Sequence, residues 1–353
     1  MFEPSGIEKF REEFGSPAVA VTGAAGFIGS HLVERLLQLG CSVVGIDDFD
    51  PWYDPNQKRQ NLVDVMGHPN FELVDSALSH ARAREVFSRS SVVFHLAGRP
   101  GVQDSWGEGF NESSTRNVEL TQRVFETSLE CGVSRVVYAS SSSIYGSGAT
   151  SLEVSPEPRP ISPYGVTKLV GEQLAHVYRN QGLEVTNLRY FTVYGPRQRP
   201  DMAMHRMFES TNPDGPVFVR RGDGQQRREF TYVSDVVGAT VAAGFVVAAA
   251  DETFDVGGGS SVSLQEVMAM VEKLSDAPMR TENVAAPAGD PAITVARTVK
   301  TSEVLGWSPE VDLFEGLRRQ CEWHRQRVLS KSVSYTHLRA HETDSYLVCR
   351  LLL

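Results

Sequence analysis

The sequence predicts an α/β fold with a doubly wound parallel sheet and a smaller C-terminal lobe. Two observations lead to this fold class. Short apolar segments alternate with helical patterns through the first half of the chain, which is typical of parallel strands buried on both faces. A glycine-rich turn joins the first apolar segment to a helix, and an acidic residue stands at the end of the second apolar segment. Both features are found in dinucleotide-binding units. Further strands are expected at 71–74, 92–97, 135–139 and 184–188.

The glycine-rich turn follows the first predicted strand, residues 18–21. Its glycines recur at three-residue spacing and lead into a helical pattern. Glycines allow a tight turn and a close approach to a pyrophosphate, and the helix N-terminus offers N–H groups to the phosphates. We therefore expect a Rossmann-type cofactor site at five positions of this turn: Gly23, Gly26, Phe27, Ile28 and Gly29.

Asp47 ends the second predicted strand, residues 42–46. An acid at this position hydrogen-bonds the adenosine ribose hydroxyls and repels a 2′-phosphate, so NAD is favoured over NADP. The alternative is an ordinary solvated acid in a loop.

Residues 162–168 predict the start of a helix. Ser162 is suited to cap the helix and Pro163 to its first turn. Tyr164 and Lys168 then lie one turn apart on the same face. An ammonium beside the phenol is expected to lower the pKa of Tyr164, which makes Tyr164 a candidate general base. Taken alone, the pair is better explained as an ordinary solvated helix face.

Composition excludes several function classes. The formal net charge of −10 disfavours binding to nucleic acid or to an anionic membrane. The longest apolar run, 236–250, falls short of the roughly 18 residues of a membrane span, so a buried helix is expected there. The four cysteines are scattered without metal-ligand spacing, so we expect no metal site and a reducing, cytoplasmic location.

The chain divides into a predicted nucleotide-binding domain and a second lobe. The first domain is expected at 1–190, with a later segment at about 230–260 that returns to it, and the lobe mainly at 191–330. Residues 331–353 match no neighbouring pattern and are expected to be a non-native tail.

With these residues in hand, the chain resembles the extended short-chain dehydrogenases/reductases of the nucleotide-sugar epimerase/dehydratase group. The resemblance covers about residues 18–328. It rests on these motifs: Thr22–Gly29, Asp47, His95–Ala97, the serine run 140–143, Tyr164 with Lys168, Leu188–Phe191 and Arg228–Asp235.

The resemblance implies a tightly held NAD and a catalytic triad of Ser141, Tyr164 and Lys168. Tyr164 takes the proton of the sugar C4 hydroxyl while hydride leaves C4, and the 4-keto sugar then turns and takes the hydride back on its other face. Lys168 and Tyr164 also contact the cofactor. Leu96 and Ala97 are implied cofactor-binding residues.

The segments 191–196 and 199–202 are similar to those of UDP-glucuronate 4-epimerases. Oxidation at C4 of glucuronate gives a β-keto acid that loses carbon dioxide easily, so an epimerase must hold the carboxylate in place. Charge-assisted hydrogen bonds suit that task. The expected carboxylate-binding residues are Ser142, Ser143, Thr192 and Arg199. The alternative for Arg199 is a salt bridge between the lobes.

The family pattern also assigns Arg228 to the diphosphate and Asp290 to the uridine ribose. Ala77 stands where the family commonly has an aspartate near the adenine. Members that dimerise do so through a four-helix bundle, so a homodimer is expected through the helices at 114–131 and 163–180.

The same residues leave other functions open besides a UDP-glucuronate 4-epimerase. Ser142 and Ser143 stand where dehydratases and UDP-glucuronate decarboxylases carry acids, which disfavours both activities. A UDP-glucose/UDP-galactose 4-epimerase is the second hypothesis. A non-catalytic NAD-bound sensor is the third, and the intact triad speaks against it.

Overall fold

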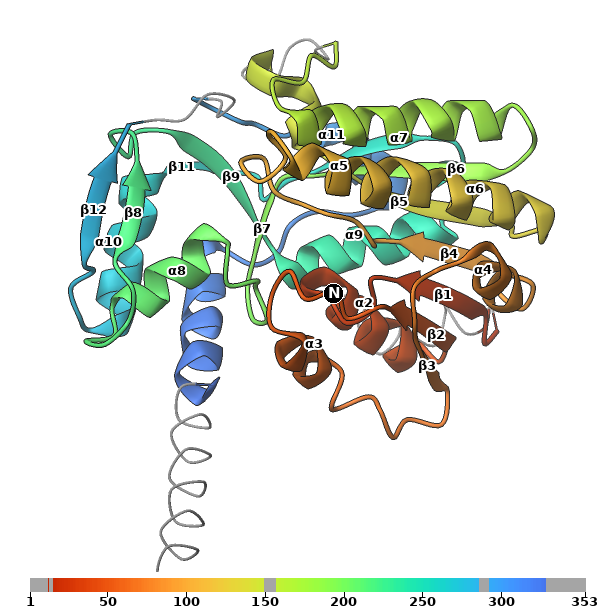
Figure 1. Ribbon diagram of the computed structural model, residues 1–353, viewed down its shortest axis with the longest axis horizontal. Coiled ribbons are helices and arrows are strands. Elements are labelled where there is room, and N and C mark those ends of the chain that lie inside the picture. Colours follow the sequence, from red (N-terminus) through yellow and green to blue (C-terminus); the bar gives the residue numbers. More distant parts are fainter. Residues whose placement is uncertain (1–11, 13–14, 149–156, 286–291, 328–353) are drawn as a thin grey trace, which may run out of the picture.

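A seven-stranded parallel sheet forms the centre of the protein (Figure 1). The computed structural model describes residues 12, 15–148, 157–285 and 292–327. The strand order is β10-β6-β5-β4-β1-β2-β3. The strands are β1 (Ala18–Thr22), β2 (Ser42–Asp47), β3 (Phe71–Asp75), β4 (Val92–His95), β5 (Arg135–Ser141), β6 (Glu184–Tyr190) and β10 (Thr253–Val256). The predicted α/β fold class is therefore confirmed, and the order reverses between β1 and β4, where such sheets bind ligands.

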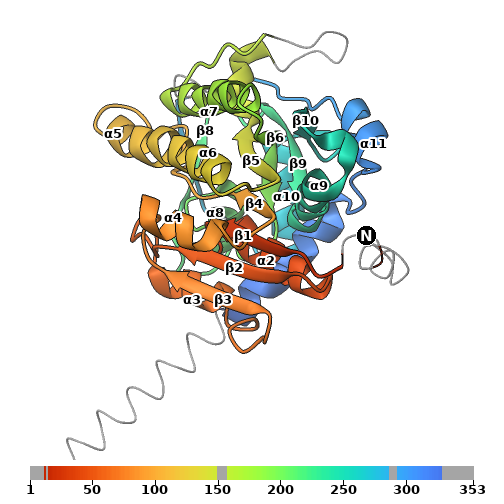
Figure 2. The ribbon, with the colours of Figure 1, turned by 90° about the vertical axis from the view of Figure 1, so that its right-hand side faces the viewer.

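Helices cover both faces of this sheet (Figure 2). On one face lie α4 (His80–Phe87), α5 (Gly109–Ser114), α6 (Leu120–Glu130) and α7 (Pro163–Arg179), with a π-helical turn at Thr115–Glu119; on the other lie α2 (Phe27–Gln38), α9 (Val233–Phe245) and α11 (Val299–Leu305). Val19 and Val21 of β1 belong to the core under α2 and α9, whereas Ala20 belongs to the core under α4 and α6. This alternation explains why both faces of each strand are apolar.

Two small sheets lie beside the main one (Figure 1). One holds β7 (Thr192–Tyr194), β9 (Arg227–Tyr232) and β11 (Ser261–Ser263), and the other pairs β8 (Phe218–Arg221) with β12 (Thr281–Val284). They are accompanied by α8 (Ala203–Ser210), α10 (Leu264–Ser275) and a helix at 313–327. Short helices α3 (Pro55–Asn61), Ser142–Gly148 and Val247–Ala249 complete the described elements. The domain boundary near residue 190 stays a prediction.

The predicted helix at 163 is α7, and its cap is as expected. The Ser162 hydroxyl accepts a hydrogen bond from the Gly165 N–H at 3.1 Å. Apolar residues at helical spacing lie on two sides of α7: Val166 and Val177 are exposed, whereas Leu169 and Leu174 are partly buried against the core. The face of α7 that packs toward the sheet carries small and polar side chains. Tyr164, Lys168 and Glu172 are buried on it.

Glu172 of α7 makes a buried ion pair with Arg189 of β6. Arg189 Nε donates to Glu172 Oε1 at 2.9 Å and Nη2 donates to Oε2 at 2.7 Å. The Ser140 hydroxyl donates to the same carboxylate at 2.5 Å. Arg189 also donates to the Tyr145 hydroxyl, which in turn donates to Asp255 of β10. The network therefore ties α7 to three strands of the sheet.

None of the helices in the described ranges combines the length and the apolar character that a membrane-spanning segment requires.

We expect Glu172→Ala to lower the free energy of unfolding by about 3–5 kcal/mol, because it leaves the Arg189 charge buried without its carboxylate. Glu72→Ala is the matched control, since Glu72 makes an equally bidentate pair with Arg89 but at a half-exposed site. That variant should lose only about 0–1 kcal/mol. Urea unfolding measures both values, and equal losses in the two variants would contradict the structural role given to the buried pair.

Candidate active site

A cleft opens at the carboxyl ends of β1, β2, β4 and β5. All ten residues predicted to contact the cofactor line it: Gly23, Gly26, Phe27, Ile28, Gly29, Asp47, Leu96, Ala97, Tyr164 and Lys168. Arg199, from the segment that follows β7, lines the same cleft. The structure therefore brings the two predicted halves of the site together, although the role of each residue stays a prediction.

The glycine turn forms a cradle that fits a pyrophosphate. Helix α2 begins after Gly26, and no side chain caps its first N–H groups. A Cβ on Gly29 would lie 2.0 Å from the Gly23 carbonyl oxygen, and a Cβ on Gly23 would lie 2.8 Å from the Ala97 nitrogen. Gly23 also has a positive φ of 72°. Only glycine fits these positions, and the uncapped helix end offers N–H donors to an anion.

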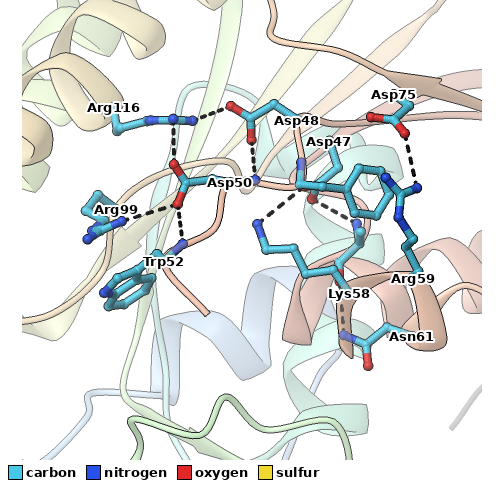
Figure 3. Close-up of polar contacts among 12 residues, drawn as sticks. Asp47, Asp48, Asp50, Trp52, Lys58, Arg59, Asn61, Asp75, Arg99 and Arg116 are labelled. Carbon is cyan, nitrogen blue, oxygen red and sulfur yellow. Dashed lines mark hydrogen bonds and ion pairs between the residues drawn. The ribbon is translucent and has the colours of Figure 1, made fainter. Parts of the chain in front are cut away.

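Asp47 lies buried at the end of β2. Its carboxylate accepts from the Ala25 N–H at 3.1 Å and from the Phe49 N–H at 2.9 Å. Lys58 of α3, which the sequence analysis did not single out, places its Nζ 3.5 Å from Asp47 Oδ1 (Figure 3). Burial raises the pKa of Asp47, and the charge of Lys58 and the two N–H groups act against that rise.

Tyr164 and Lys168 both line the cleft, whereas Ser141, at the end of β5, does not. Tyr164 has a hydrogen bond with Ser141. Burial raises the pKa of Tyr164 above its ordinary value, while the bond to Ser141 and the charge of Arg199 act in the opposite direction. The predicted lowering of the Tyr164 pKa by Lys168 is therefore wrong, because the loss of water at this site outweighs the interactions that favour the phenolate.

Lys168 has partners other than Tyr164. Its Nζ donates to the Ala139 carbonyl oxygen at 2.9 Å and lies 5.1 Å from the centre of the Tyr138 ring. Burial lowers the pKa of Lys168 to about 8. The carbonyl and the ring face both favour the charged ammonium, which keeps a cation near the cleft despite burial.

The loop after β2 adds a group of charged residues to the cleft wall (Figure 3). Arg116, from the π-helical turn, donates to Asp48 and, at 2.7 Å, to Asp50. Asp50 also pairs with Arg99 at 3.3 Å. Sequence analysis missed these residues because no periodicity marks them. Their position just after the carboxyl end of a parallel strand was the available signal.

The predicted sugar-binding residues are only partly gathered at the cleft. Arg199 lines it and makes a bidentate pair with Asp201, 3.0 Å at each contact. This pair joins residues two positions apart, so it is not the salt bridge between lobes that was the alternative. Four other residues do not line the cleft as described: Ser142, Ser143, Thr192 and Arg228. Asp290 lies outside the described residues.

Comparison with known proteins identifies the relatives of this chain. The NAD dependent epimerase/dehydratase family matches residues 19–257. A UDP-glucuronate 4-epimerase from Thermodesulfobacterium geofontis is 33% identical over 320 residues, 89% of this chain and 98% of that protein. An uncharacterized UDP-glucose epimerase from Bacillus subtilis is 38% identical over 304 residues, 86% of this chain and 96% of its own length.

A solved structure shows the same fold with ligands bound. The UDP-glucuronic acid 4-epimerase from Bacillus cereus, in complex with UDP-glucuronic acid and NAD, matches with a TM-score of 0.82. The two sequences are 38% identical, and the match covers 88% of this chain and 99% of that one.

We expect Gly29→Ala to abolish or strongly reduce the NAD retained by the purified protein, because the new Cβ collides with the Gly23 carbonyl and displaces the cradle. Gly67→Ala is the matched control, since a Cβ there meets nothing within 4 Å. The bound NAD is measured by chromatography after denaturation. Full NAD content in Gly29→Ala would show that the close approach in the turn is not needed for the cofactor.

Proposed function

The chain belongs to the NAD-dependent epimerase/dehydratase family, and we propose that it is a UDP-sugar 4-epimerase that interconverts UDP-glucuronate and UDP-galacturonate. One observation carries the proposal. A single cleft joins the glycine cradle, the buried Tyr164 and Lys168, and the guanidinium of Arg199. Relatives with this activity and relatives that act on UDP-glucose both support the 4-epimerase reaction.

The reaction moves one proton and one hydride in each direction. Bound NAD supplies a hydride acceptor and donor at the sugar C4. Tyr164 takes the proton from the C4 hydroxyl as the bond between C4 and its hydrogen breaks. It returns a proton to the C4 oxygen after the 4-keto sugar has turned over. Ser141, hydrogen-bonded to Tyr164, is proposed to hydrogen-bond the C4 oxygen, and the positive charge of Arg199 favours the phenolate. Lys168 is proposed to contact the cofactor.

Arg199 favours glucuronate as the sugar. Its charge is close enough to act on the pKa of Tyr164, so it lies near the place where the reacting sugar must bind. The 4-keto form of glucuronate is a β-keto acid, and a carboxylate held by a guanidinium cannot turn freely into the geometry that releases carbon dioxide. Ser142, Ser143 and Thr192 remain proposed partners of the carboxylate, and Arg228 and Asp290 remain proposed for the UDP moiety.

UDP-glucose is the second candidate substrate. The contact of Arg199 with Asp201 favours it, because an arginine that already holds a carboxylate has less to gain from a second one. A decarboxylase and a non-catalytic NAD-bound sensor are more remote. Ser142 and Ser143 offer no acid for the first, and the buried Tyr164 and Lys168 are not needed for the second.

We also propose a homodimer in the cytoplasm. The outer side of α7 exposes Val166 and Val177, so one of the two helices predicted to pack between the copies presents apolar side chains to the solvent. Cys41, Cys131 and Cys321 form no disulfide, which fits a reducing location.

The direct test is to incubate the purified protein with UDP-glucuronate, without added NAD, and to resolve the products by proton NMR. Formation of UDP-galacturonate without net NADH is the expected result, because the cofactor is restored in each cycle. Conversion of UDP-glucose alone, in a parallel sample, would instead establish the second candidate.

We expect Tyr164→Phe to lower kcat by about 10²- to 10⁴-fold, the usual contribution of a positioned acid–base group. NAD content should remain unchanged. Tyr178→Phe is the matched control on the same helix, because the Tyr178 hydroxyl bonds to Glu126 and Gln122 away from the cleft. Its kcat should equal that of the wild type. Wild-type turnover by Tyr164→Phe would show that another group carries the proton.

We expect Arg199→Ala to weaken UDP-glucuronate binding by about 10- to 100-fold, because a hydrogen bond between charged groups is lost. Binding of UDP-glucose should change much less, since it has no carboxylate. Calorimetric titration of the NAD-loaded protein with each ligand measures both. Equal losses for the two sugars would remove Arg199 from carboxylate binding.

A further inference from the structure

The ring of Trp52 lies close to two guanidinium groups at the wall of the cleft. The Cζ of Arg99 is 4.3 Å from the centre of its ring, and the Cζ of Arg199 is 5.1 Å from it. Both distances are within the roughly 6 Å over which an aromatic face attracts a cation. All three residues line the cleft, and Arg199 comes from the segment that follows β7.

Asp50 holds this stack in place. Its Oδ1 accepts from the backbone N–H of Trp52 at 2.9 Å and pairs with Arg99 at 3.3 Å (Figure 3). Its other oxygen accepts from Arg116 at 2.7 Å. One carboxylate therefore holds both the backbone that carries Trp52 and the Arg99 guanidinium that lies close to its ring.

The contacts of Arg199 with Asp201 leave other N–H donors of the guanidinium available for a second anion. Asp201 binds the edge formed by Nε and Nη2, and the Trp52 ring attracts the guanidinium carbon. The N–H donors of the other edge are not used by Asp201, so a substrate carboxylate can bind without displacing it. Asp201 and Trp52 together therefore restrict the guanidinium in two directions.

We propose that Trp52 is a positioning residue that sets selectivity for an acidic sugar. It holds the guanidinium of Arg199 at the cleft wall, next to the reacting sugar, and so favours a UDP-sugar that carries a carboxylate over its neutral counterpart. The proposal rests on the function proposed above. It assigns to the loop after β2, which otherwise borders the cofactor, a second role in the choice of sugar.

Trp52→Leu removes the aromatic face, and Trp52→Phe keeps one. The Tyr164→Phe background prevents turnover during calorimetric titration of the NAD-loaded protein with UDP-glucuronate, UDP-glucose and UDP. We expect Trp52→Leu to weaken UDP-glucuronate binding by roughly three- to thirty-fold, the range of a cation–π contact, and to leave the other two ligands unchanged. Trp52→Phe should restore most of the affinity.

A double-substitution cycle tests whether Trp52 acts through Arg199. In an Arg199→Ala background, Trp52→Leu should cause no further loss of UDP-glucuronate affinity, because the group it positions is absent. Additive losses would overturn the proposal, and so would equal weakening of UDP-glucose or of UDP, which would indicate a general disturbance of the loop.

The experiments distinguish a wrong assignment of the substrate from a wrong role for Trp52. If the protein with intact Tyr164 and Trp52 does not convert UDP-glucuronate, the function is wrong whatever the variants do. If it converts UDP-glucuronate and Trp52→Leu binds that ligand normally, the function stands and the role of Trp52 is wrong.

Discussion

Burial of charged side chains beneath α7 is the constraint on which the rest of the site depends. The helix approaches the sheet so closely that a Cβ on Gly171 would lie 2.1 Å from the Tyr138 hydroxyl oxygen. At that distance Lys168 and Glu172 point into the core, and each is stable there only because a fixed partner meets it: the Ala139 carbonyl for the ammonium and Arg189 for the carboxylate. These pairings set the rotation of the helix, and the rotation presents Tyr164 to the cleft.

The same burial explains the electrostatics of the site. Loss of water raises the pKa of Tyr164 and lowers that of Lys168, so the surroundings oppose both charged forms. Groups that favour the phenolate therefore matter more than they would in water. Ser141 and Arg199 are two of them, and they come from different parts of the chain.

The loop after β2 connects the two ends of the cleft. Its first residue, Asp48, and then Asp50 are held by Arg116, and the loop continues to Trp52, whose ring centre lies 5.1 Å from the Cζ of Arg199. A short run of chain with defined contacts therefore extends along the cleft from the end of β2 to Arg199.

Local patterns in the sequence determined the fold class, the glycine turn, the acid after β2 and the helix that carries Tyr164 and Lys168, because each depends on residues near one another in the chain. The exposed position of Val166 and Val177 could not be predicted, because the spacing of apolar residues indicates that a helix has an apolar face but not what that face packs against. Only the tertiary structure decided that Arg199 approaches the ring of Trp52, that Lys58 meets Asp47, and that burial raises the pKa of Tyr164. Those outcomes depend on which segments, distant in the sequence, exclude water from a group and which charges they bring close to it. The spacing of residues in the sequence gives information on neither.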